Sequence, residues 1–118
     1  MLFEVVASPA PGASEVTVLS VTGEIDVASA PRLRQEVVSL AGAGRVLLVV
    51  DLAGVDFLDS TGLGVLLGAL KRVRAGGGEL ALSRAEPQVA KVFEITRLSD
   101  ILPLHDSVEA AVAAVVEA

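Results

Sequence analysis

The chain has 118 residues, a length that suits one domain able to bury its own core, and 53% of them are hydrophobic but only 3% aromatic. Its formal net charge of −6 argues against a surface that binds nucleic acid, and the absence of cysteine excludes disulfides and thiolate chemistry. The abundant Val, Leu and Ala are typical of an α/β fold with a buried parallel sheet. We therefore expect a single domain over residues 1–118.

Nothing in the sequence suggests contact with a membrane. The longest apolar stretch without a charge, residues 62–70, is far shorter than the ~20 residues that a membrane-spanning helix needs. The N-terminal residues 1–4 lack the basic segment of a signal peptide. We expect no direct membrane insertion and a cytoplasmic location.

The first part of the chain is predicted to form a β-hairpin. β-Branched residues favour strands over 2–7 and 15–22. The segment between them contains Pro and Gly and is typical of a turn, and Gly23 is expected to end the second strand. These two strands are expected to pair with each other.

Helices and strands are predicted to alternate in the segment that follows. A helix is expected to begin at Ala28–Pro31, where Ser29 is a candidate N-cap, and to end at Gly42. The uninterrupted apolar run over 46–50 predicts a strand that is buried on both faces and closed by Asp51.

The second half of the chain continues the alternation. A helix is predicted from Ser60 to Arg74, and residues 79–83 favour a strand. Ile101–Leu102 is a candidate edge strand, and the last helix is expected to begin within Asp106–Glu109. Pro87 opens a further helix, whose inward face is expected to carry Val89, Val92, Phe93 and Thr96.

The order of elements predicts the fold class. It reads ββαβαβα(β)α, and the alternation after residue 28 demands parallel crossover connections. The opening hairpin adds an antiparallel pair. We therefore expect an α/β fold with a mixed, mostly parallel sheet of four to five strands and about four helices.

The sequence lacks the residue patterns that common classes of enzyme need. The sequence has neither a nucleotide-binding P-loop nor a dinucleotide-binding fingerprint, and its only histidine is His105, so hydrolase and metal sites lack partners. Asp51 resembles the phosphoacceptor of a receiver domain, but residues 7–10 lack the acidic pair that such a domain needs. We expect no enzymatic activity, no cofactor and no metal.

Glycines and basic residues on the predicted helices have structural explanations. Gly64 and Gly68 fall on one helical face, where they are expected to allow close approach of a neighbouring backbone. Two basic groups, one at Arg32 and Arg34 and one at residues 71–74, are interpreted as complements of the helix dipoles.

Ser60 lies where a buried strand gives way to a helix. As an N-cap, its hydroxyl would accept a hydrogen bond from the first helical turn, which stabilises a helix by about 0.5–2 kcal/mol. Asp56 and Asp59 lie beside it in sequence, and a second acidic cluster at Glu24–Asp26 follows another strand. Loops at the same ends of parallel strands converge, and a phosphate on Ser60 would add about −1.5 to −2 charges there. The residues alone leave both a cap and a switch open.

Two motifs resemble those of a known family. The segment Asp56–Gly64, DFLDSTGLG, resembles the phosphorylation motif of bacterial anti-sigma factor antagonists, which have the STAS fold. The segments GEID at 23–26 and APRLR at 30–34 are similar to the early motif of that family. The spacing of the motifs and the order of the elements match over nearly the whole chain.

The resemblance implies a mechanism. Members of the family bind an anti-sigma factor that is also an ATP-dependent serine kinase, and this binding releases the sigma factor. The kinase phosphorylates the motif serine, which is Ser60 here, with Thr61 as a weaker candidate. The phosphorylated protein no longer binds the anti-sigma factor. A serine phosphatase then removes the phosphate and restores binding. The implied partner-binding residues are Glu24, Asp26, Asp56, Asp59, Ser60, Thr61, Gly62, Leu63 and Gly64.

A different function remains open for the same fold. Free-standing STAS chains also serve as subunits of membrane transport systems for lipids or anions, and Ser60 or Thr61 would then serve docking to a transporter ATPase. The complete DSTGLG motif at 59–64 favours the sigma pathway, with a role in stress response or sporulation.

Overall fold

The computed structural model describes residues 3–118, so Leu2, at the start of the predicted first strand, lies outside the described residues. The elements in chain order are β1 (Glu4–Ala10), β2 (Ala13–Ile25), α1 (Ala30–Gly42), β3 (Leu47–Leu58), α2 (Ser60–Ala75), β4 (Glu79–Ser83), α3 (Pro87–Ile95), the short 3-10 helix η1 (Leu98–Asp100), β5 (Leu104–His105) and α4 (Val108–Val116).

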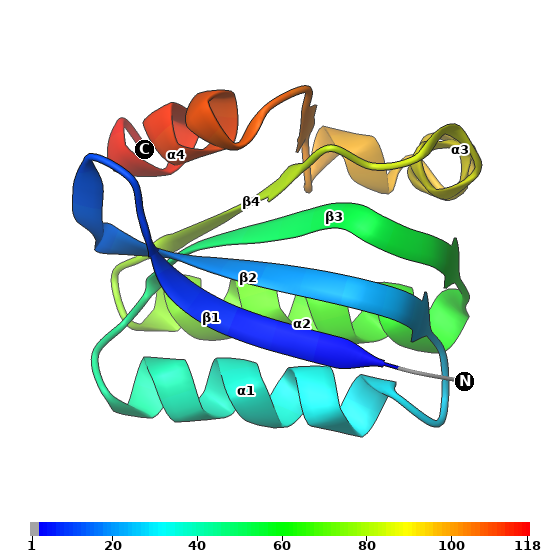
Figure 1. Cartoon of the computed structure of the whole chain (residues 1–118), viewed down its shortest axis with the longest axis horizontal. Coiled ribbons are helices and arrows are strands. Elements are labelled where there is room, and N and C mark those ends of the chain that lie inside the picture. Colours follow the sequence, from blue (N-terminus) through cyan, green and yellow to red (C-terminus); the bar gives the residue numbers. More distant parts are fainter. Residues whose placement is uncertain (1–2) are drawn as a thin grey trace.

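The five strands form one mixed sheet, in the spatial order β1-β2-β3-β4-β5. β1 pairs antiparallel with β2, and the three other pairs are parallel. α1 and α2 lie side by side on one face of the sheet, and α3 and α4 lie on the opposite face (Figure 1). The predicted order of elements and the mixed, mostly parallel sheet are confirmed.

The core has two clusters of buried side chains, and the larger one also includes Val89 and Phe93 of α3. β3 contributes to both, because successive residues of a strand point to opposite faces, and this explains its uninterrupted apolar run. Full burial of each Val or Leu side chain contributes about 1.5–3 kcal/mol. The larger cluster includes Leu19, Leu48, Val50 and Leu82 with Leu33, Val37, Leu66 and Leu70 of α1 and α2. The smaller cluster joins Val16, Val18, Val49 and Ala81 to Ala111 and Val115 of α4.

The second and central strands are longer than predicted. β2 continues through Gly23, which adopts φ +103°, and β3 continues past Asp51. The register between them shifts twice, each time with one extra residue on β3, and such bulges bend a strand. The prediction that Gly23 and Asp51 end their strands was wrong, because pairing with a neighbouring strand extends both.

The C-terminal third differs from the prediction at two places. The edge strand is β5, not Ile101–Leu102: Leu102 is fully buried in the core, and pairing with β4 begins only after Pro103. Thr96 was expected to point inward but is exposed, and its hydroxyl donates a hydrogen bond to the Val92 carbonyl at 2.8 Å. A polar group at the end of α3 thus completes the last turn and does not pack in the core.

Asp51 is a buried carboxylate on β3. It is 6% exposed, and its Oδ1 accepts hydrogen bonds from Arg84 Nε at 3.0 Å and from Ser83 Oγ at 3.1 Å. Arg84 Nη2 donates to the other carboxylate oxygen, so the pairing is bidentate. This hydrogen bonding with Asp51, together with its negative charge, raises the pKa of Arg84. Both oxygens of Asp51 are engaged, which argues against the phosphoacceptor interpretation.

Arg84→Ala should destabilise the protein by about 1–3 kcal/mol, because it leaves the carboxylate of Asp51 buried with Ser83 as its remaining partner. Urea unfolding followed by circular dichroism at neutral pH measures the loss. The double variant Arg84→Ala/Asp51→Asn should be more stable than Arg84→Ala alone, because the buried charge is gone. A double variant that is equally stable or less stable would contradict this account.

Candidate functional site

The two acidic turns lie at the same edge of the sheet. β2 and β3 run parallel and end level, since Ile25 pairs with Leu58 (right-hand end of the sheet in Figure 1). The amide of Asp59 donates to the carbonyl of Ile25 at 3.3 Å, which joins the start of α2 to the end of β2. The expectation that these loops converge is confirmed.

Asp59, and not Ser60, is the N-cap of α2. Its backbone is extended (φ −107°, ψ −173°), and its Oδ1 accepts a hydrogen bond from the amide of Gly62 at 3.0 Å. A carboxylate at this position also interacts favourably with the positive end of the helix dipole. The prediction of Ser60 as a cap was therefore wrong by one residue, because the aspartate before it takes the bond.

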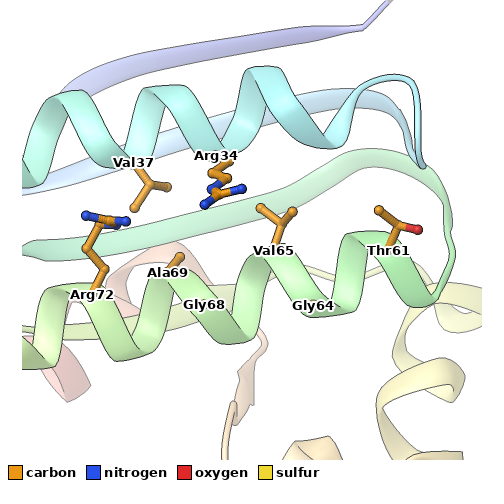
Figure 2. Close-up of a pocket in the computed structure, with 8 residues that line it drawn as sticks. All are labelled: Arg34, Val37, Thr61, Gly64, Val65, Gly68, Ala69 and Arg72. Carbon is orange, nitrogen blue, oxygen red and sulfur yellow. The ribbon is translucent and has the colours of Figure 1, made fainter.

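The hydroxyl of Ser60 remains free. Ser60 is the first residue of α2, its side chain is exposed, and within residues 3–118 its Oγ makes no hydrogen bond. The neighbouring Thr61 is also exposed, and its side chain points into the space between α1 and α2 (Figure 2). A phosphate on Ser60 would therefore leave the cap of the helix intact.

Gly62, Leu63 and Gly64 have different environments. Gly62 is buried, and a Cβ there would lie 2.5 Å from Leu58 Cδ1 and 2.8 Å from the carbonyl oxygen of Ile25. Leu63 is 8% exposed and packs in the core. Gly64 is exposed, and a Cβ there would meet nothing within 4 Å. Gly62 and Leu63 thus hold α2 against the core, while Gly64 lies at the surface.

Asp26 organises the turn before α1. Its Oδ1 accepts hydrogen bonds from the amides of Ala28 at 3.0 Å and Ser29 at 3.1 Å. Ser29 lies at the N-cap position of α1, as expected, but its hydroxyl makes no capping bond and instead donates to the carbonyl of Glu24 at 2.6 Å. The other carboxylate oxygen of Asp26 accepts no hydrogen bond from residues 3–118, so it is available to a partner.

The rest of this edge combines negative charge with exposed apolar side chains. Asp56 is exposed at the second bulge of β3, and Glu24 is partly exposed opposite Phe57. Neither acidic side chain forms an ion pair within the described part of the chain. Phe57 is 48% exposed and Val27 72%. The sequence interpretation missed these two apolar residues, because it ended the strands before them and so placed neither residue on a face of an element.

In the described residues, no helix has both the length and the apolar character needed to cross a membrane. The same residues contain no group of three His, Asp or Glu side chains placed to hold a metal ion.

Gly62→Ala should destabilise the protein by about 1–3 kcal/mol, because the added Cβ meets the backbone of Ile25, which cannot rotate away. Gly64→Ala is the matched control and should stabilise it by about 0.5–1 kcal/mol, because its Cβ has open space in a helix. Thermal and urea unfolding of both variants measure the two effects. Similar stability for both would show that α2 does not need the close approach at Gly62.

Asp59→Ala should lower the free energy of unfolding by about 0.5–2 kcal/mol through loss of the cap. Ser60→Ala should leave it nearly unchanged, because the serine hydroxyl makes no bond to the first turn. The same unfolding measurements compare the two variants. A larger loss of unfolding free energy in Ser60→Ala than in Asp59→Ala would show that Ser60 is the cap.

Known proteins are similar to this chain in sequence. Residues 7–111 match the STAS domain. The chain is 42% identical over 94 residues to the anti-sigma-B factor antagonist of Bacillus subtilis. The aligned residues cover 80% of this chain and 85% of that protein.

Solved structures of anti-sigma factor antagonists share the fold. One from Mycobacterium paratuberculosis has a TM-score of 0.83 at 28% identity, and the match covers 97% of this chain and 94% of that one. The Bacillus protein SpoIIAA, solved in unphosphorylated and phosphorylated forms, gives TM-scores of 0.68 and 0.69 at 22% and 23% identity. Those matches cover 98% and 97% of this chain and 98% and 99% of SpoIIAA. The chain therefore belongs to the STAS domain family of anti-sigma factor antagonists.

Proposed function

We propose that this protein binds an anti-sigma factor through the surface around Ser60 and thereby releases a sigma factor. The observation that carries the proposal is the free, exposed hydroxyl of Ser60 at the first turn of α2, beside the turn formed by Asp26. Asp26 and Asp59 each use one carboxylate oxygen within their own turn, and the other oxygen can accept a hydrogen bond from the partner. The protein acts as a regulator in the cytoplasm and not as an enzyme.

Phosphorylation of Ser60 switches this binding off. A phosphate adds about −1.5 to −2 charges and considerable bulk to an edge that already carries Asp26, Asp56 and Asp59. The positive end of the α2 dipole offsets part of the repulsion inside the protein, so the fold tolerates the group. A partner that is complementary to carboxylates and a small hydroxyl is repelled and sterically excluded.

The comparison structures support a switch without refolding. SpoIIAA in its unphosphorylated and phosphorylated forms matches this fold about equally well, with TM-scores of 0.68 and 0.69. The kinase in our proposal is the anti-sigma factor itself, which supplies ATP and Mg²⁺, and a serine phosphatase resets the switch. Ser60 is favoured over Thr61 as acceptor because Thr61 lines the hollows between α1 and α2, whereas Ser60 does not.

Incubation of the purified protein with ATP and the anti-sigma factor of the same organism should add one phosphate, located at Ser60 by mass spectrometry. In calorimetric titrations, Ser60→Asp should weaken binding at least about tenfold, or ~1.4 kcal/mol. Ser60→Ala should bind like the wild type but stay bound when ATP is present.

Ser39→Asp is the matched control, since Ser39 is an exposed serine on α1. It adds the same charge away from the acidic edge and should bind normally. A phosphate on any other residue would overturn the assignment of the site. Binding of Ser60→Asp with wild-type affinity would refute the charge mechanism.

A further inference from the structure

A groove between α1 and α2 begins directly beside Ser60. It consists of two hollows of about 360 Å³ and 450 Å³, and Arg34, Thr61 and Val65 line both, so the two are continuous. In Figure 2, the side chains of Arg34 and Val37 point from α1, and those of Thr61, Val65 and Arg72 from α2, into the same space.

Gly64 and Gly68 leave the α2 side of this groove open. A Cβ at either position would meet nothing within 4 Å, and neither glycine has a positive φ. The expectation that they allow a backbone of the same chain to approach closely was therefore wrong. A glycine inside a helix is about 0.5–1 kcal/mol less favourable than alanine, and here the fold gains nothing in return. The open space is thus available to atoms of another molecule.

The α1 side of the groove is apolar and exposed. Val27, Pro31 and Val38 line the outer hollow, and Val27 and Val38 are 72% and 38% exposed. Exposed apolar side chains that gather at a groove indicate a contact surface for another molecule.

The groove is also locally positive. Arg34 and Arg72 line it from opposite helices, and within residues 3–118 neither forms an ion pair. Arg72 lies in the last turn of α2, as a complement of the dipole would, but Arg34 lies in the N-terminal half of α1, where the dipole does not favour a cation. In a chain of net charge −6, two such arginines form a site complementary to carboxylates.

We propose that the groove binds an apolar segment of the anti-sigma factor that carries acidic side chains. The proposal rests on the proposed function and extends its interface from Ser60 through Thr61 into the groove. Apolar side chains of that segment fill the space over Gly64 and Gly68, and its carboxylates pair with Arg34 and Arg72.

The two parts of this interface carry opposite charge. The edge around Ser60 is acidic and the groove is basic, so only one orientation of the partner satisfies both. That orientation holds the kinase with its active site over Ser60.

Charge reversal tests the electrostatic part. Arg34→Glu and Arg72→Glu should each weaken binding to the anti-sigma factor of the same organism at least about tenfold in calorimetric titrations. Phosphorylation of Ser60 by that factor at sub-saturating concentration should slow in proportion. Lys71→Glu is the matched control: Lys71 is exposed on α2, does not line the groove, and its reversal changes the net charge equally.

Filling the groove tests the steric part. Gly68→Leu should keep or raise the thermal stability, because its side chain enters open space on a helix, yet weaken binding at least about tenfold. Gly42→Leu on α1 is the matched control, since a Cβ there also meets nothing and Gly42 does not line the groove. It should bind like the wild type.

The outcomes separate the two proposals. A wild-type protein that does not bind the anti-sigma factor would overturn the proposed function and this inference with it. Binding that Ser60→Asp abolishes, but that Arg34→Glu, Arg72→Glu and Gly68→Leu leave unchanged, would overturn the groove alone.

Discussion

The parallel pairing of β2 with β3 is the constraint on which the rest of the structure depends. It brings Ile25 level with Leu58, so that two turns far apart in the chain meet at one edge of the sheet. Gly62 then allows α2 to approach the end of β2, where any side chain would meet the carbonyl of Ile25. The acidic edge of the proposed interface follows from this alignment.

Several residues at this edge combine a structural and a proposed functional role. Asp26 and Asp59 each hold their own turn through Oδ1, and this local bonding fixes the direction of the remaining carboxylate oxygen. Because Asp59 takes the capping bond, Ser60 needs no structural role and its hydroxyl is free to react. By contrast, the carboxylate of Asp51 is buried, and both of its oxygens accept hydrogen bonds, from Arg84 and Ser83.

Periodicity predicted the elements whose stability is local. The predicted bounds of α1 and α2 agree closely with the observed ones, because a helix forms its hydrogen bonds within itself. Strands obtain theirs from neighbours, so the extension of β2 beyond Gly23 and the position of β5 escaped prediction. The N-cap was misplaced for a related reason, because Ser60 and Asp59 are both good caps and only the geometry of the chain at Ile25 selects between them.

By itself, the sequence determined the fold class, the order of the elements and the two acidic motifs, because apolar periodicity and turn residues are properties of consecutive positions. Only the tertiary structure decided which residues reach the surface together. It left the hydroxyl of Ser60 free and set Arg34 and Arg72 across one groove from different helices. Those arrangements depend on how strands pair and how helices pack on the sheet, and no local pattern encodes that packing.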